Sequence, residues 1–184
     1  MLQVDPHLPP GRYDLTLVLA PLSDGAAAKA RASLGTIEIE SLERSFTVPP
    51  LEHKTNAIFS DTLKLPGYAL RQETGDLRIT LYWQALRRMD YYKAFVHLYD
   101  AQSGALVAQY DAVPRGWTYP TNWWEAGEVV SDKITLPLEG IPAGQYRIAV
   151  GVYAPDTLER LPVQTEPGMP LGDHLELEDI IRVP

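Results

Sequence analysis

The sequence predicts an all-β protein built as a two-sheet antiparallel sandwich. Apolar side chains recur at every second position along the chain, helical periodicity is nearly absent, and turn residues separate the alternating runs. Residues 13–19 and 77–83 each place four large apolar side chains on one face. The pattern returns over residues 93–100, 105–112, 129–136, 145–153 and 175–183. Short strands at this spacing are typical of an immunoglobulin-like sandwich.

The chain also shows internal similarity. Residues 9–21 resemble residues 142–155 with one residue fewer, so that Tyr13 corresponds to Tyr146. We therefore predict that residues 1–50 are the C-terminal strands of a partial preceding repeat, and that residues 51–184 are a complete domain. The alternative, that the two segments look alike only because β-hairpins share turn chemistry, stays open. Half a sandwich leaves an apolar face uncovered, so we expect association through residues 1–50.

Composition excludes several function classes. The net charge of −8, with no local cluster of lysine and arginine, argues against nucleic acid as a partner. The chain contains no cysteine, which removes disulfides, thiolate chemistry and the common structural zinc sites. No apolar run approaches the length of about 20 residues that a membrane helix needs, so we expect no membrane insertion by this fragment. No cofactor is predicted.

The sequence offers no catalytic or metal motif. The four histidines, at positions 7, 53, 97 and 174, do not stand at metal-ligand spacing. No G-x-S-x-G nucleophile elbow is present, and the many acidic residues lie mostly near strand ends. A glycosidase would need two acids at a defined separation, which a sequence does not give, whereas solvated loop acids need no such arrangement. We predict a protein that is not an enzyme.

Several stretches within residues 58–163 resemble one kind of bacterial domain. They comprise residues 59–68, 81–85, 119–121 with Trp124, 127–130, 142–146, 153–155 and 159–163. In these stretches the chain resembles extracytoplasmic β-domains appended to bacterial membrane glycosyltransferases of the protein-mannosyltransferase type. The resemblance implies an extracytoplasmic location, at the cell surface or in the periplasm, as part of a larger membrane-bound protein. Transferase activity would then belong to the membrane portion of that protein.

The segment that begins at residue 145 also resembles the penultimate strand of immunoglobulin-like sandwiches. In those domains a tyrosine near the strand start donates a hydrogen bond to upstream backbone, and an apolar core residue follows two positions later. This resemblance implies the first role for Tyr146 and the second for Ile148. Both roles are structural.

An aromatic loop at residues 115–125 holds three of the four tryptophans. Aromatic faces beside polar side chains are a common way to hold sugars, which makes the loop a candidate carbohydrate platform. Its candidate ligand-binding residues are Trp117, Trp123, Arg115, Asn122 and Glu125. The rival hypothesis makes the loop a lid that packs over one end of the sandwich. Tyr119 and Trp124 lie in the stretch that carries the family resemblance, so we assign them to packing.

These observations favour a non-catalytic accessory domain that acts as a spacer or interaction module. The alternative is a carbohydrate-binding module that uses the aromatic loop, so the partner left open is a carbohydrate or a protein. Exposure of Trp117 and Trp123 side by side over a groove would favour the alternative, whereas burial of both would favour the spacer.

Overall fold

The computed structural model describes residues 7–19, 30–40, 42–165 and 168–184. The chain divides into two compact units, Met1–Glu43 and Arg44–Pro184. The parts of the predicted segment 1–50 at residues 1–6, 20–29 and 41 lie outside the described residues. Residues 44–50 belong to the second unit, so the boundary between the units lies earlier in the chain than residue 50.

The first unit is an antiparallel hairpin of β1 (Gly11–Leu19) and β2 (Ala30–Ile39). It has an internal irregularity between Leu15 and Thr16, where the pairing shifts by one residue. The hairpin confirms the strands expected in this part of the chain.

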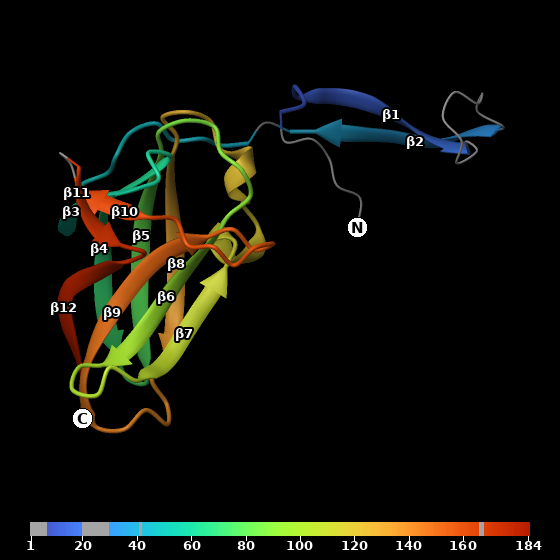
Figure 1. Ribbon diagram of the computed structural model, residues 1–184. Helices are drawn as coiled ribbons and strands as arrows, with labels where there is room; N and C mark the ends of the chain where they lie inside the picture. Colours follow the sequence, from blue (N-terminus) through green and yellow to red (C-terminus); the bar gives the residue numbers. More distant parts are fainter. Residues whose placement is uncertain (1–6, 20–29, 41, 166–167) are drawn as a thin grey trace. The chain divides into compact units, whose positions relative to one another are not determined.

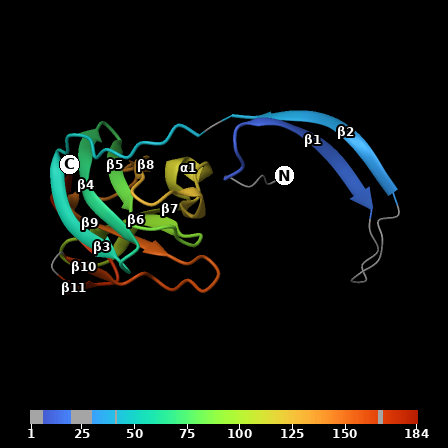
Figure 2. The same ribbon diagram turned by 90° about the horizontal axis from the view of Figure 1, so that it is seen from above.

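The second unit is a sandwich of two antiparallel sheets, as the sequence predicts (Figure 1). The larger sheet has the order β11-β10-β3-β4-β5-β8 and the smaller one β12-β9-β6-β7. The larger sheet consists of β3 (His53–Phe59), β4 (Leu63–Glu73), β5 (Asp76–Ala85), β8 (Val129–Pro137), β10 (Val163–Thr165) and β11 (Met169–Gly172). The smaller sheet consists of β6 (Lys93–Asp100), β7 (Leu106–Ala112), β9 (Gly144–Tyr153) and β12 (Leu175–Val183). Seen from above in Figure 2, the two sheets form separate layers.

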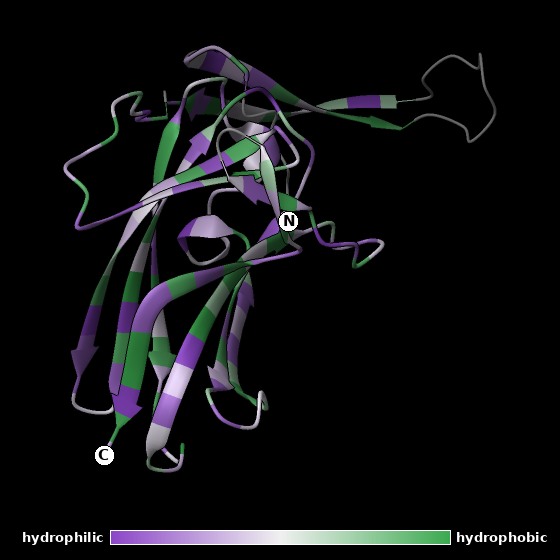
Figure 3. Cartoon of the chain, turned by 60° about the vertical axis from the view of Figure 1, so that its left-hand side comes forward, coloured by the Kyte–Doolittle hydropathy of each residue, from purple (hydrophilic) through white to green (hydrophobic). Residues whose placement is uncertain are grey.

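Period-two burial builds the core between the two sheets. In β5 the apolar residues at positions 77, 79, 81 and 83 are buried, and the residues between them are not. Figure 3 shows hydrophobic and hydrophilic positions alternating along strands of the sandwich. In β6 and β9 the inward residues include Val96, Leu98, Ile148 and Val150, each fully buried. Trp83, Trp124 and Phe59 are among the large aromatic residues of this core, together with three buried tyrosines, Tyr68, Tyr119 and Tyr146. Burying such side chains provides the main favourable free energy of folding.

Two short helical segments interrupt the path from β7 to β8. They are α1 (Pro114–Trp117) and the 3₁₀ turn η1 (Thr121–Trp123). In the described part of the chain no helix is long and apolar enough to cross a bilayer.

Strand β4 departs from simple alternation because it carries Pro66 and Gly67 in its middle. The pairing of β4 with both of its neighbours shifts there, which leaves the proline outside the hydrogen-bonded ladder. A Cβ on Gly67 would meet the carbonyl oxygen of His53 at 2.2 Å, so only glycine fits this close approach of β3 and β4.

Corresponding tyrosines lie in two antiparallel strand pairs, the hairpin β1-β2 and the pair β9-β12, whose strands are separated along the chain by β10 and β11. Tyr146 Oη donates to Pro142 O at 2.6 Å, and Tyr13 Oη donates to Pro9 O at 2.7 Å. Tyr146 pairs with Ile181 of the neighbouring strand, and Tyr13 pairs with Ile37. The two strand pairs therefore share local contacts, and the origin of residues 1–50 in a preceding repeat stays a prediction.

Candidate functional site

The candidate site lies on the outer face of the four-stranded sheet, meaning the face turned away from the six-stranded sheet. Alternation along β6 sends Val96 and Leu98 into the core and Phe95, His97 and Tyr99 to this outer face. Figure 1 shows β12, β9, β6 and β7 as the front layer, so the outer face is turned toward the viewer.

Two small residues of β9 make room for the aromatic rings of β6. Phe95 pairs with Gly151, and His97 pairs with Ala149. A Cβ on Gly151 would meet the ring of Phe95 at 2.1 Å, which shows that the ring lies directly against this glycine. The ring centroids of Phe95 and His97 are 4.4 Å apart. The floor of the face is therefore aromatic and closely packed.

A hollow of about 200 Å³ opens beside these rings. It is lined by Phe95, His97, Asp111, Tyr153, Leu158 and Arg160. The guanidinium carbon of Arg160 lies 4.6 Å from the centroid of the Phe95 ring, and an Arg160 nitrogen lies 3.1 Å from Asp173. The guanidinium of Arg160 is thus held by two contacts, a cation–π interaction with the Phe95 ring and an ion pair with Asp173.

Polar groups of the hollow are linked to one another. His97 Nε2 lies 3.4 Å from Asp111 Oδ2, and His97 Nδ1 lies 3.2 Å from the hydroxyl of Tyr99. Burial lowers the pKa of His97, although the Asp111 carboxylate opposes that shift. Burial and the same carboxylate raise the pKa of Tyr153. The hollow therefore offers the imidazole of His97, the phenol of Tyr153, the carboxyl group of Asp111 and the guanidinium of Arg160 as hydrogen-bonding groups.

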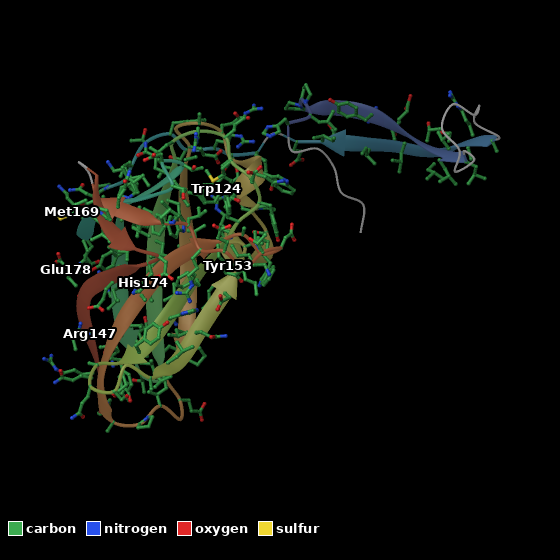
Figure 4. The ribbon with its side chains drawn as sticks, in the orientation of Figure 1. Trp124, Arg147, Tyr153, Met169, His174 and Glu178 are labelled. Carbon is green, nitrogen blue, oxygen red and sulfur yellow. The ribbon has the colours of Figure 1, made fainter. Side chains whose placement is uncertain are left out.

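A second, wider hollow of about 650 Å³ continues the outer face toward the loop between β6 and β7. Its lining residues include Tyr99, Arg147, His174 and Glu176, together with residues 100–104. Tyr99 and Arg147 are direct cross-strand partners, one row further along the sheet than His97 and Ala149. Figure 4 labels Arg147, His174 and Tyr153, which mark the course of the face.

The charged groups of this second hollow are paired or hydrogen-bonded. Arg147 lies 2.7 Å from Glu176. Hydrogen bonds from the side chain and backbone of Ser103 lower the pKa of Asp100. The hollow is thus polar and balanced in charge, with Tyr99 as its aromatic member.

The aromatic loop is held mainly by a buried carboxylate. Glu128 is 1% exposed and accepts hydrogen bonds from Tyr119 Oη at 2.6 Å and from the backbone N–H of Glu125 at 2.9 Å. Arg44 pairs with the same carboxylate and also donates to the carbonyl of Trp123 at 2.9 Å. These contacts tie the loop to the start of the second unit.

The aromatic residues of the loop differ in exposure. Tyr119 and Trp124 are buried, with ring centroids 6.1 Å apart, and Trp124 Nε1 donates to Tyr119 O at 3.2 Å. Trp123 is half-buried and packs edge-on against Tyr119. Trp117 is 57% exposed, and Lys93 Nζ lies 4.5 Å from the centroid of its ring. Trp117 and Trp123 are therefore neither both buried nor both exposed.

The remaining polar residues predicted for the sugar platform do not converge on one point. Asn122 is exposed, and Glu125 forms a two-pronged ion pair with Arg88, with contacts of 2.8 and 3.0 Å. The guanidinium of Arg115 lies 4.7 Å from the ring centroid of Tyr119. The loop thus turns most of its polar groups to contacts within the protein.

Sequence reasoning missed the outer face as a site. It considered His97 together with the other histidines, for metal-ligand spacing. A usable signal was present: Phe95, His97 and Tyr99 alternate on β6, while Ala149 and Gly151 alternate on β9. Aromatic residues opposite small ones on an outward face indicate a hollowed surface.

The described carboxylates near the site do not gather into a metal-binding cluster. No group of three histidine, aspartate or glutamate side chains within the described ranges gathers closely enough to hold a metal ion. Burial raises the pKa of Asp132, but its Oδ1 accepts the backbone N–H of Arg115 at 2.7 Å beneath the loop. What the outer face offers chemically is stacking and hydrogen bonding.

Fold and site together describe an all-β sandwich domain with a hollowed outer face. Four solved chains match it. One of them, the C-terminal domain of wzt, is 12% identical, with 74% of this chain and 89% of that chain covered and a TM-score of 0.44. No family model and no curated protein matches the sequence.

Proposed function

We propose that the second unit is a non-catalytic accessory domain that binds an oligosaccharide on the outer face of its four-stranded sheet. The observation that supports this most is the hollow over Phe95, where the partly exposed ring of Tyr153 stands next to the polar groups of Arg160 and Asp111. Phe95 and His97 are 1% and 6% exposed, so their rings form the floor beneath this hollow. Sugars present apolar ring faces together with hydroxyls, so they need stacking surfaces and hydrogen-bonding groups at the same place.

The absence of catalysis is part of the proposal and is supported by how the acids of the face are used. Asp111 contacts His97, and Asp173 contacts Arg160 and His174. The pKa of Asp173 is lowered, chiefly by the hydrogen bond with His174. A general acid needs the opposite shift, toward a raised pKa.

The setting is proposed on sequence resemblance alone. The parent protein would be a membrane glycosyltransferase of the protein-mannosyltransferase type, and this domain would lie outside the cytoplasm. Residues 1–50 would be the end of a preceding repeat of the same kind, supported by the matching hydrogen bonds of Tyr13 and Tyr146.

A spacer without a ligand is the second candidate, because the aromatic loop is tied down by Glu128 and Arg44. A glycan array of bacterial and plant oligosaccharides separates the two, followed by titration calorimetry on Tyr153→Ala and Trp123→Ala variants. We expect binding that Tyr153→Ala weakens more than tenfold and Trp123→Ala leaves unchanged. A flat array would favour the spacer, and sensitivity to Trp123→Ala alone would favour the aromatic-loop platform.

A further inference from the structure

The turn that carries Trp117 has an unusual backbone. Three consecutive residues, Arg115, Gly116 and Trp117, have positive φ values of 57°, 60° and 73°. Left-handed conformations cost free energy for residues other than glycine, and they persist where surrounding contacts fix them. Two of these three residues are not glycine, so this turn is held in place by other parts of the fold.

The contact that fixes the turn comes from a buried carboxylate. Asp132, which is 1% exposed, accepts the backbone N–H of Arg115 at 2.7 Å. The turn also closes on itself, with the N–H of Trp117 donating to Val113 O at 2.9 Å. As a result a large aromatic side chain is held with 57% of its surface exposed, although burying it would be favourable.

Trp117 stands at one end of the outer face. Lys93 Nζ lies 4.5 Å from the centroid of the Trp117 ring. Lys93 is also the direct cross-strand partner of Tyr153, which lines the smaller hollow. Lys93 also shares its face of β6 with Phe95 and His97, since these positions alternate. The surface therefore runs from Trp117 past Lys93 and Tyr153 to the hollow.

Leu158, which also lines the hollow, is a second exposed apolar residue with an unusual backbone conformation. Leu158 has a φ of 60° and is 72% exposed, and its N–H donates to Ala154 O at 2.8 Å. A branched apolar residue in this conformation is an outlier. One exposed apolar side chain thus lines the hollow, and the exposed Trp117 lies further along the same face, beside Lys93.

We propose that Trp117 is an additional stacking subsite of the outer face, and that its ligand is a linear oligosaccharide of several residues rather than a single sugar. This inference rests on the proposed function. From Lys93, which contacts Trp117, to His97 in the hollow the face measures about 14 Å, at about 3.4 Å per strand residue. A ligand that reaches Trp117 from the hollow must span more than one sugar ring. Asp132 acts through the turn and is a positioning residue.

The test is titration calorimetry of the whole chain with manno-oligosaccharides and cello-oligosaccharides from one to six residues. For the wild type we expect affinity to rise with chain length, by roughly two- to tenfold for the sugar that reaches the tryptophan, the range of an added aromatic contact. Trp117→Ala should remove this rise and leave the affinity for the shortest binding ligand unchanged, whereas Trp117→Phe should retain it.

Asp132 is tested by a matched pair of variants. Asp132→Asn keeps an acceptor for the N–H of Arg115 and should preserve the dependence on chain length, whereas Asp132→Leu should abolish it. Since Asp132→Leu also risks misfolding, the exposed Trp117→Ala variant decides the outcome for the subsite. Length dependence that survives Trp117→Ala would overturn this inference alone. No binding by any member of either series would overturn the proposed function together with it.

Discussion

Replacing Arg44 by alanine should destabilise the second unit, because it leaves the buried carboxylate of Glu128 without its cationic partner. Glu128 is 1% exposed and the Arg44 side chain 17% exposed. Removing one partner of a buried pair costs roughly 3–5 kcal/mol, and the lower end, about 3 kcal/mol, applies because Arg44 retains some contact with water. The variant also loses the hydrogen bond from Arg44 to Trp123 O.

Thermal and urea unfolding measure this cost directly. A loss of about 3 kcal/mol corresponds to a fall in melting temperature of roughly 6–12 °C for a chain of this size. The matched control is Arg88→Ala, which removes an ion pair with Glu125 in the same loop. The Arg88 side chain is 64% exposed, so this control should cost about 1 kcal/mol or less.

A double-mutant cycle with Glu128→Gln identifies the source of the effect. The glutamine cannot accept from both Tyr119 and the N–H of Glu125 as the carboxylate does, so it destabilises by itself. The two changes together should cost less than their sum by about 1–2 kcal/mol. An Arg44→Ala variant as stable as Arg88→Ala would refute the view that this carboxylate holds the loop.

Three further predictions follow from single contacts. Gly151→Ala places a Cβ 2.1 Å from the Phe95 ring, so the ring must move, and oligosaccharide binding should weaken more than tenfold in calorimetry. Unchanged affinity would contradict the claim that the Phe95 ring forms the floor of the binding site. Tyr146→Phe removes the hydrogen bond to Pro142 O and should cost the second unit about 1 kcal/mol in urea unfolding, whereas Tyr13→Phe should cost that unit nothing. The folded pKa of His97 is lowered, so the unfolded chain binds the proton first as the pH falls, and stability should decrease below about pH 6.5 until the folded pKa is reached. His97→Gln should flatten that part of the pH profile, and an equally steep profile would refute the assignment.

The sequence predicted strands that carry a continuous apolar face. Residues 77–83 and 93–100 lie in β5 and β6 because one face of each strand is apolar throughout. Strand β4 was not predicted, because Pro66 interrupts the pattern and only the shifted pairing on both sides accommodates it. Strand β3 was missed because its first half is polar. The hydrophobic pattern of a short segment does not predict a strand whose formation depends on its pairing with neighbouring strands.

The candidate site was harder to predict than the fold. The aromatic loop drew attention because its tryptophans are close in sequence, yet Trp124 is buried and Trp123 half-buried. The hollow on the outer face joins residues from β6, β7, β9 and the segment after it, such as Phe95 and Arg160. Their proximity depends on the register of three strands, and no short window of sequence contains that information.

Nuclear magnetic resonance of the isotopically labelled chain, titrated with the oligosaccharide that binds best on the array, tests the central claim most directly. We expect chemical-shift changes at outward residues of β6, β7 and β9, including Phe95, His97 and Tyr153, with little change at Trp123 and Trp124. Changes confined to Trp123 and its neighbours in the aromatic loop, or no changes anywhere, would contradict the assignment of the outer face as the binding surface.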